Sequence, residues 1–260
     1  MQRRTQVRLV RVVFYTLFAV AVVYVGVNAD WARLQNRFFN LQIAADMFPR
    51  VVTVAARNTL IFTVLSFSFG LILGLILALM RLSTIRPYRW FAAVYIEVFR
   101  GLPALLTIFL IGFGIPIGLG FSIPGRYGPG TVGLGLVAAA YMAETIRAGI
   151  EAVPRAQMEA ARSLGMRYSR AMASIVVPQA FRIIIPPMTN ELVLLLKDTS
   201  LLFVIGTRQG MEELTKFGRD VLNLRASPTP LIVVGLVYLA ITIPMTRLVA
   251  LLERRARRAR

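Results

Sequence analysis

The sequence predicts an all-α polytopic membrane protein with about six transmembrane helices. Hydrophobic residues make up 57% of the 260 residues and the mean hydropathy is +0.68, so the chain is more apolar than ordinary soluble domains. A helix that crosses a hydrocarbon core of about 30 Å needs roughly 20 apolar residues. Six segments meet this requirement, namely residues 9–29, 53–80, 88–115, 131–150, 187–206 and 228–252.

The excess of positive charge fits a membrane protein. Thirty Lys and Arg residues against twelve Asp and Glu residues give a net charge of +18. In a soluble protein such an excess would suggest a nucleic-acid partner. Here most arginines lie in short loops between apolar segments, where positive charge fixes the topology. We therefore expect membrane lipid, and no nucleic acid, as a partner.

The missing residue types exclude several kinds of enzyme. The chain has no Cys and no His, which removes disulfides, thiol nucleophiles, imidazole bases and the usual zinc sites. Its two lysines, Lys197 and Lys216, do not end a Gly-x-x-x-x-Gly-Lys phosphate-binding loop. We therefore expect no catalytic residue and no metal site, and any ATP that the protein uses must be bound by another chain.

The basic loops also predict the orientation. Positive charge collects on the cytoplasmic side of a membrane, and with six spans this rule places both termini in the cytoplasm. The first apolar segment can alternatively be a signal peptide that is cleaved after Ala29, since it has a basic start and a small-residue end. Its apolar stretch is long for a signal peptide, which favours a retained anchor.

The chain divides into three regions around one domain. Residues 1–50 contain a basic start, the first transmembrane helix and an outer-face amphipathic stretch that fits an interfacial helix. Residues 51–252 form the transmembrane domain, with a charged cytoplasmic loop at 151–185. Residues 253–260 form a basic cytoplasmic tail, which we expect to hold the last helix against anionic lipid.

The charged loop at 151–185 contains a short helix with clear end signals. Pro154 suits the first position of a helix and Gly165 the left-handed residue just past its end, while Pro178 limits a second helix. Apolar residues recur at three-residue steps on one face, and charged residues occupy another. The periodicity alone leaves two interpretations open, a helix in the lipid headgroups or a helix in a groove of a partner. The apolar face consists of Met158, Ala161 and Leu164, and the charged one of Arg155, Glu159 and Arg162.

The spelling of this loop resembles the EAA loop of ABC importer permeases. The pattern has specified residues at fixed spacing, and the usual leucine before its last proline is replaced by Val177. The flanking stretches AETIRAGI (143–150), EVFRGLP (97–103) and LKDTSLL (196–202) look like the polar amino acid uptake branch of that family. The residues that match the EAA pattern are Glu159, Ala160, Ala161, Gly165, Ile175 and Pro178.

The resemblance carries expectations about fold and partners. It implies the ABC type I importer transmembrane-domain fold with one extra N-terminal helix, in the inner membrane of a bacterium. It also implies that the EAA residues form a coupling helix, which docks in a separate ATP-binding subunit that holds ATP and magnesium. A second permease subunit, identical or homologous, an extracytoplasmic solute-binding protein and an amino acid substrate would complete the transporter.

Four charged residues fall inside the predicted spans. Glu97 and Arg100 lie about 14 to 18 Å along the third span, just before a helix break expected at 101–103, and Lys197 and Asp198 lie in the fifth. Intramembrane charges usually face a cavity or a partner. They can cradle a zwitterionic substrate, with Thr199 as a weaker candidate beside them.

A structural interpretation of the same charges remains open. Glu97 with Lys197, and Arg100 with Asp198, can instead be buried pairs that fix the helix register. The adjacent pair at 197–198 points in directions about 100° apart, so its members should meet different neighbours. Glu144 and Arg147, three residues apart in the fourth span, fit a local ion pair better than a substrate contact.

Two other functional classes remain as alternatives. An ion-coupled secondary transporter would act without an ATPase, but it would need internal pseudo-symmetry, and no second copy of the break at 101–103 is evident in the sequence. A non-transporting membrane scaffold would have no use for four costly charges within its spans.

Overall fold

The computed structural model describes residues 2–206 and 210–258, and the side chains of residues 8–206 and 210–254. The predicted basic tail lies partly outside these ranges, as do the side chains of the basic start. Within them the chain is helical without a strand, so the all-α class is confirmed. The α-helices are α1 (Gln2–Asn28), α2 (Trp31–Phe38), α3 (Leu41–Asp46), α4 (Arg57–Leu82), α5 (Arg86–Gly101), α6 (Ala104–Phe109), α7 (Ile115–Leu119), α8 (Gly128–Glu151), α9 (Arg155–Ser163), α10 (Tyr168–Ala171), α11 (Val177–Asp198), α12 (Leu214–Arg225) and α13 (Thr229–Arg258). Shorter turns connect some of them: the π-helical η1 (Val51–Ala56), η2 (Leu110–Gly114) and η3 (Met172–Val176), and the 3-10 helix η4 (Thr199–Ile205).

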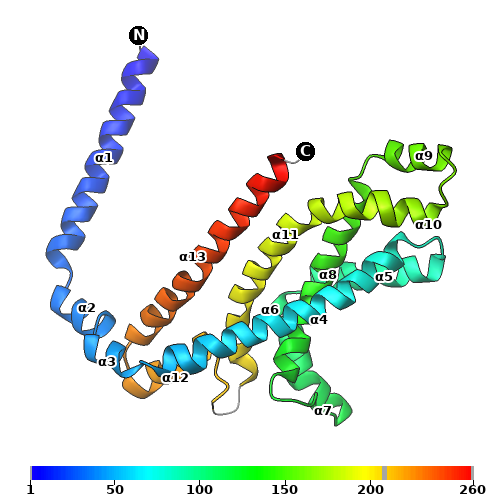
Figure 1. The fold of residues 1–260 in the computed structure, drawn as a ribbon. Helices are drawn as coiled ribbons and strands as arrows, with labels where there is room; N and C mark the ends of the chain where they lie inside the picture. Colours follow the sequence, from blue (N-terminus) through cyan, green and yellow to red (C-terminus); the bar gives the residue numbers. More distant parts are fainter. Residues whose placement is uncertain (1, 207–209, 259–260) are drawn as a thin grey trace.

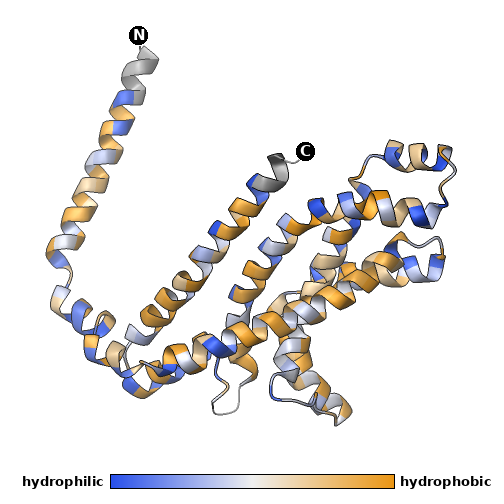
Figure 2. Ribbon diagram, viewed as in Figure 1, coloured by the Kyte–Doolittle hydropathy of each residue, from blue (hydrophilic) through white to orange (hydrophobic). Residues whose placement is uncertain are grey.

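The described residues contain four helical stretches that are long and apolar enough to cross a membrane, or five if one bent pair counts as a span. Figure 2 shows hydrophobic residues along most of α4 and α13, and hydrophilic residues on α2, α9 and α10. The fourth predicted span, residues 131–150, forms α8, which is 24 residues long but is not among these stretches. Its many Gly and Ala residues are buried against other helices, so α8 needs less apolar surface than a helix facing lipid. The four stretches are Arg8–Asn28, Val51–Leu82, Tyr168–Val204 and Thr229–Arg254.

The contact between α4 and α8 is the most extensive in the fold. Glycines on α4 allow it, because the two backbones approach closely there. A Cβ atom added at Gly74 would stand 3.0 Å from the carbonyl oxygen of Ala139, and one at Gly70 would stand 3.1 Å from the Cβ of Ala138. The buried core around this crossing includes Leu77, Ala78, Leu134, Met142 and Ile146.

The predicted third span is not one straight helix. α5 and the stretch Ala104–Leu119 meet at an angle of 105°. The break falls at residues 101–103, as the sequence predicted, because proline disfavours a helical conformation in the residue before it. Leu102 is accordingly extended, with ψ 140°. Because of this bend, α5 and α6 form a corner beside α8.

The first helix stands apart from the others (Figure 1). Its span Arg8–Asn28 has no buried residue. The following pair α2 and α3, here called the elbow, is fastened to the start of α13. The hydroxyls of Ser227 and Thr229 both donate to the carbonyl oxygen of Arg37, at 2.7 and 2.9 Å, and Arg225 pairs with Asp46 at 3.0 Å.

The elbow has the amphipathic character that the sequence predicted for residues 31–50. Asp30 caps α2 by accepting a hydrogen bond from the N–H of Arg33. Trp31 and Phe38 are exposed apolar residues on this short helix, which also carries Arg33 and Arg37. Its placement at a lipid interface stays a prediction.

Candidate functional site

The short helix α9 in the EAA loop is closed at both ends. Pro154 is the N-cap, one position before the first helical residue rather than that residue itself. Gly165 takes a left-handed φ of 80°, as predicted. Its N–H donates to the carbonyl oxygen of Arg162 at 3.0 Å, and the N–H of Met166 donates to that of Ala161 at 3.1 Å. These two bonds form a Schellman cap, which fixes the end of the helix.

One face of α9 packs on the chain itself. Ala161 is buried and Met158 is half-buried, both as expected for the predicted apolar face. Because this face is packed, α9 cannot move without moving the start of α11 and the turn before it. The apolar cluster next to Met158 consists of Val153, Val176 and Ala180.

The opposite face of α9 is exposed. Glu159 and Ala160 lie there, and the hydroxyl of Ser163 donates back to the carbonyl oxygen of Glu159 at 3.0 Å. Leu164 was predicted on the packed face, but it is 84% exposed. The reason is that Leu164 is the C-cap, where the chain leaves the helix and the helical periodicity ends. The helix therefore presents one apolar and several polar side chains outward.

The last two EAA positions lie where the loop joins α11. Ile175 is half-buried in η3, and Pro178 is exposed in the first turn of α11. Pro178 does not limit a helix as predicted, because a continuous helical stretch runs from Tyr168 to Val204. The π-helical turn directly before Pro178 and its place in the first turn accommodate its missing N–H.

A cavity of about 270 Å³ lies at the corner between α5 and α6, against α8 and α11. Its polar side chains are Tyr141, Glu191 and Asp198, and the remaining wall is apolar. The guanidinium carbon of Arg100 lies 5.5 Å from the centre of the Tyr141 ring, within the range of a cation–π contact. The site thus offers two carboxyl groups, one phenol and one neighbouring cation.

The structure separates the predicted intramembrane charges. Asp198 lines the cavity, whereas Arg100 is exposed and contacts the ring of Tyr141, one of the lining residues. Glu97 and Lys197 are exposed and do not line it. Lys197 and Asp198 therefore do face different surroundings, as their helical spacing predicted. Thr199 is buried, and its hydroxyl donates to the carbonyl oxygen of Leu196 at 2.6 Å.

The predicted structural pairs of these charges are not formed. Among the described residues, neither Glu97 with Lys197 nor Arg100 with Asp198 makes an ion pair. Glu97 and Lys197 are therefore charges on the surface of a single subunit, within segments that contact the membrane.

Sequence reasoning missed Glu191. It lines the same cavity as Asp198 from two turns earlier on α11. The signal was available, because residues seven apart lie on one face of a helix. Glu191 is a third charge in the same predicted span as Lys197 and Asp198.

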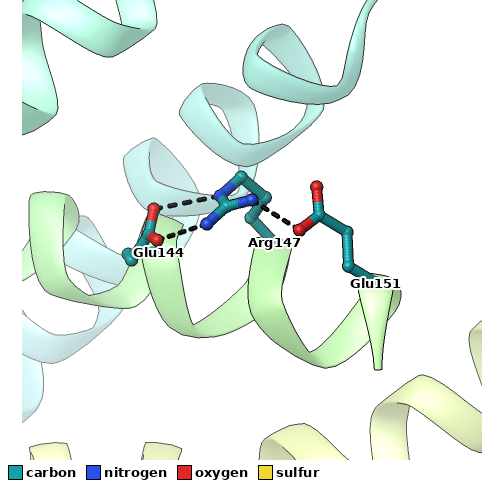
Figure 3. Close-up of polar contacts among 3 residues, drawn as sticks. All are labelled: Glu144, Arg147 and Glu151. Carbon is teal, nitrogen blue, oxygen red and sulfur yellow. Dashed lines mark hydrogen bonds and ion pairs between the residues drawn. The ribbon is translucent and has the colours of Figure 1, made fainter. Parts of the chain in front are cut away.

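An ion-pair triad lies at the C-terminal end of α8, next to the EAA loop (Figure 3). Arg147 donates to both carboxyl oxygens of Glu144, at 2.5 and 3.1 Å, which confirms the predicted local pair. It also donates to Glu151 at 2.5 Å, a contact that the sequence analysis did not include. Three charges paired along two helical turns stabilise the helical segment that leads into α9.

Comparison with known proteins decides the family. A family model described as binding-protein-dependent transport system inner membrane component matches residues 70–258. The chain belongs to this family. An arginine transport system permease protein of Bacillus subtilis is 40% identical over 197 residues, which cover 76% of this chain and 88% of that protein. A probable glutamine ABC transporter permease protein of the same organism is 37% identical, over 83% and 97% of the two chains.

Solved structures agree with the permease fold. The crystal structure of an amino acid ABC transporter with histidines contains a chain that is 36% identical, with a TM-score of 0.74, over 81% of this permease and 96% of that chain. A structure of the MetNI methionine ABC transporter matches with a TM-score of 0.65 at 18% identity, which shows a shared fold alone. The predicted family, the importer transmembrane-domain fold and the role as a transport permease are confirmed.

Proposed function

We propose that this permease forms one half of the translocation path of an ATP-driven importer for amino acids in a bacterial inner membrane. The observation that carries the proposal is α9, a short helix capped at both ends whose exposed face bears Glu159 and Ala160 of the EAA pattern. This exposed face is the surface that docks in a separate ATP-binding subunit.

The other partners follow from the same proposal. The ATP-binding subunit holds ATP and magnesium, a second permease subunit completes the path, and an extracytoplasmic solute-binding protein delivers the substrate. Both termini face the cytoplasm. In support, the two ends of the chain and α9 lie toward the same end of the molecule, whereas the elbow and α12 lie toward the other (Figure 1).

The cavity beside α11 is the proposed substrate contact within this subunit. Arg100, beside Tyr141, can attract a carboxylate, and Asp198 and Glu191 in the lining can accept hydrogen bonds from an ammonium group. Glu97 and Lys197 are exposed on the single subunit, and charges at membrane depth face a partner or a wet path. They therefore line the path toward the second permease subunit. The hydroxyl of Thr199 donates to the carbonyl oxygen of Leu196 one turn earlier. Thr199 therefore affects the packing of this region rather than offering its hydroxyl to the substrate.

A physical connection joins the two sites. The packed face of α9 lies on η3 and the first turns of α11, and α11 carries Glu191 and Asp198 toward its other end. When the ATP-binding subunits close, a displacement of α9 passes along a continuous helical stretch to the cavity. The capped ends of α9 and the ion pairs of Arg147 keep α9 and the end of α8 helical during this displacement.

The coupling role of α9 can be tested by two substitutions on its exposed side. We expect Glu159→Lys and Gly165→Asp to abolish uptake and substrate-stimulated ATP hydrolysis in the reconstituted complex, since one reverses the charge of the docking face and the other strains a left-handed residue. Membrane insertion should stay normal. Ser169→Ala, an exposed position beyond the cap, is the matched control.

Two results would contradict the proposal. If both variants kept wild-type ATPase stimulation and assembly, α9 would not be the docking helix. If the purified permease alone took up amino acids without any ATPase subunit, it would be an ion-coupled secondary transporter instead.

A further inference from the structure

A groove of about 1140 Å³ runs between α4 and α13. Its lining on η1 and α4 extends from Val52 to Leu65, which is about 20 Å at the rise of an α-helix. On α13 it extends from Val233 to Ile241, and Phe48 reaches it from just after the elbow. Both helices belong to membrane-spanning stretches, so the groove opens on the lipid in the half of the membrane next to the elbow.

The groove is a built feature of the fold. Ala56 and Val233 belong both to its lining and to a buried cluster that joins α12, α13 and η1. Small side chains in its lining, among them Ala240 on α13, leave the space of the groove open. Because its floor is part of this cluster, the groove cannot close without disturbing the buried packing.

Arg57 is the charged residue of the lining. Its side chain is exposed, and among the described residues it takes part in no hydrogen bond, ion pair or cation–π contact. The neighbouring Arg50, by contrast, lies 5.9 Å from the ring centre of Phe217. A guanidinium at the edge of hydrocarbon requires an anionic partner or water, and the groove therefore joins an apolar slot to one unpaired cation.

We propose that this groove binds a phospholipid, with one acyl chain in the apolar slot and the phosphate on Arg57. A guanidinium matches a phosphate with two parallel hydrogen bonds. A slot of about 20 Å is long enough for a chain that crosses one leaflet, which is about half of the 30 Å hydrocarbon core. The lipid fills the gap between α4 and α13 and holds the two helices at a fixed separation.

Charge favours a lipid over a helix of a second copy. A helix in the groove would bury Arg57 and would have to supply a carboxylate. The apolar parts of α1, α4 and α13 contain neither Asp nor Glu, over residues 2–28, 57–82 and 229–252. The one carboxylate of α13, Glu253, lies about three helical turns beyond Ile241, the end of the groove lining. A phosphate supplies the missing charge without a protein carboxylate.

The test counts lipid bound to the purified transporter. The assembled complex is stripped of lipid in detergent, titrated with palmitoyl-oleoyl phosphatidylglycerol and analysed by native mass spectrometry. We expect Arg57→Gln to weaken binding of the tightest lipid roughly tenfold, because it removes a charge-assisted contact. Arg33→Gln on α2 removes the same charge outside the groove and should bind like the wild type. Ala240→Phe should fill the slot and also lose the lipid, whereas Leu239→Phe, on the same helix but outside the lining, should keep it.

Three outcomes overturn the proposal. Wild-type binding in both Arg57→Gln and Ala240→Phe would place the lipid elsewhere. Absence of a tight lipid on the wild type would leave the groove without this ligand. Disulfide cross-linking between two permease copies through Leu236→Cys in native membranes would show that a second subunit occupies the groove.

Discussion

At the scale of single residues, the carboxyl groups of α11 carry the proposed substrate contact in the cavity. Glu191 and Asp198 line one space and have no ion-pair partner among the described residues. Two carboxyl groups can bind one ammonium group and one additional cation of the same substrate. With the cavity as the proposed substrate contact, we infer that this arrangement favours an amino acid with a cationic side chain over a neutral one.

The first residue-scale prediction concerns this preference. We expect Glu191→Gln to lower uptake of cationic amino acids by about tenfold and uptake of neutral ones by much less, since one charge-assisted contact is lost. Asp198→Asn should alter the same preference. The measurement is competitive uptake across a panel of amino acids in vesicles that contain the whole transporter. Unchanged uptake across the panel in both variants would remove these residues from the path.

Glu213, at the start of α12, predicts a pH dependence of stability. Its carboxylate is buried, accepts hydrogen bonds from the N–H groups of Thr215 and Lys216 at 2.6 Å each, and accepts one from the hydroxyl of Tyr238 at 3.2 Å. Burial outweighs these bonds and raises the pKa of Glu213 from 4.5 to about 7. The folded chain therefore holds this proton more tightly than the unfolded chain does.

The sign of the effect follows from the raised pKa. The contribution of Glu213 to stability is fully present below the unfolded pKa of 4.5 and is lost as the pH rises through about 7. We expect Glu213→Gln to remove this component, which is at most on the order of 3 kcal/mol. Thermal unfolding of the purified complex at about pH 5 and about pH 8 measures it. An identical pH dependence in the variant and the wild type would contradict the assignment.

Residue-scale reasoning from sequence succeeded where partners are close along the chain. The pair Glu144–Arg147 and the left-handed Gly165 follow from local spacing and local backbone preference. Leu164 was misplaced because periodicity cannot tell the last helical residue from its cap. The shared cavity of Tyr141 and Glu191 could not be predicted, since it depends on how α8 meets α11.

At the scale of helices, the crossing of α4 and α8 depends on small residues. We expect Gly74→Val to destabilise the subunit by about 1 to 3 kcal/mol, because its Cβ would press on the backbone of Ala139 and the side chain of Met142, each at 3.0 Å. Gly235→Val on α13 is the matched control, since no atom lies within 4 Å of its added Cβ. The midpoint of thermal unfolding measures both variants, and equal midpoints would contradict the packing argument.

Hydropathy predicted the helices and only part of their geometry. The break at 101–103 could be predicted from the sequence, because proline restricts the backbone conformation of the residue before it. Its 105° angle was not, because the angle depends on packing against α8. α8 itself was predicted as a span from length and composition, yet its Gly and Ala residues serve helix packing more than contact with lipid.

At the scale of the whole molecule, several features of this subunit need partners. Glu97 and Lys197 are exposed at membrane depth, α1 has no buried residue in its span, and α9 presents an exposed polar face. The proposed second permease, lipid and the proposed ATP-binding subunit would each cover one of these surfaces. The family match from residue 70 onward covers the first and the last of these, whereas α1 and the elbow precede it.

The most direct test of the account locates α9. The chain has no cysteine of its own, so Ala160→Cys introduces a single thiol on the exposed face of α9. In native membranes we expect this thiol, once coupled to a membrane-permeant thiol-reactive photo-cross-linker and illuminated, to cross-link to the ATP-binding subunit, and to resist a membrane-impermeant thiol reagent applied from outside. Gln35→Cys on the elbow should react with the reagent and form no such cross-link. Labelling of Ala160→Cys from outside, without a cross-link to the ATP-binding subunit, would contradict the central claim.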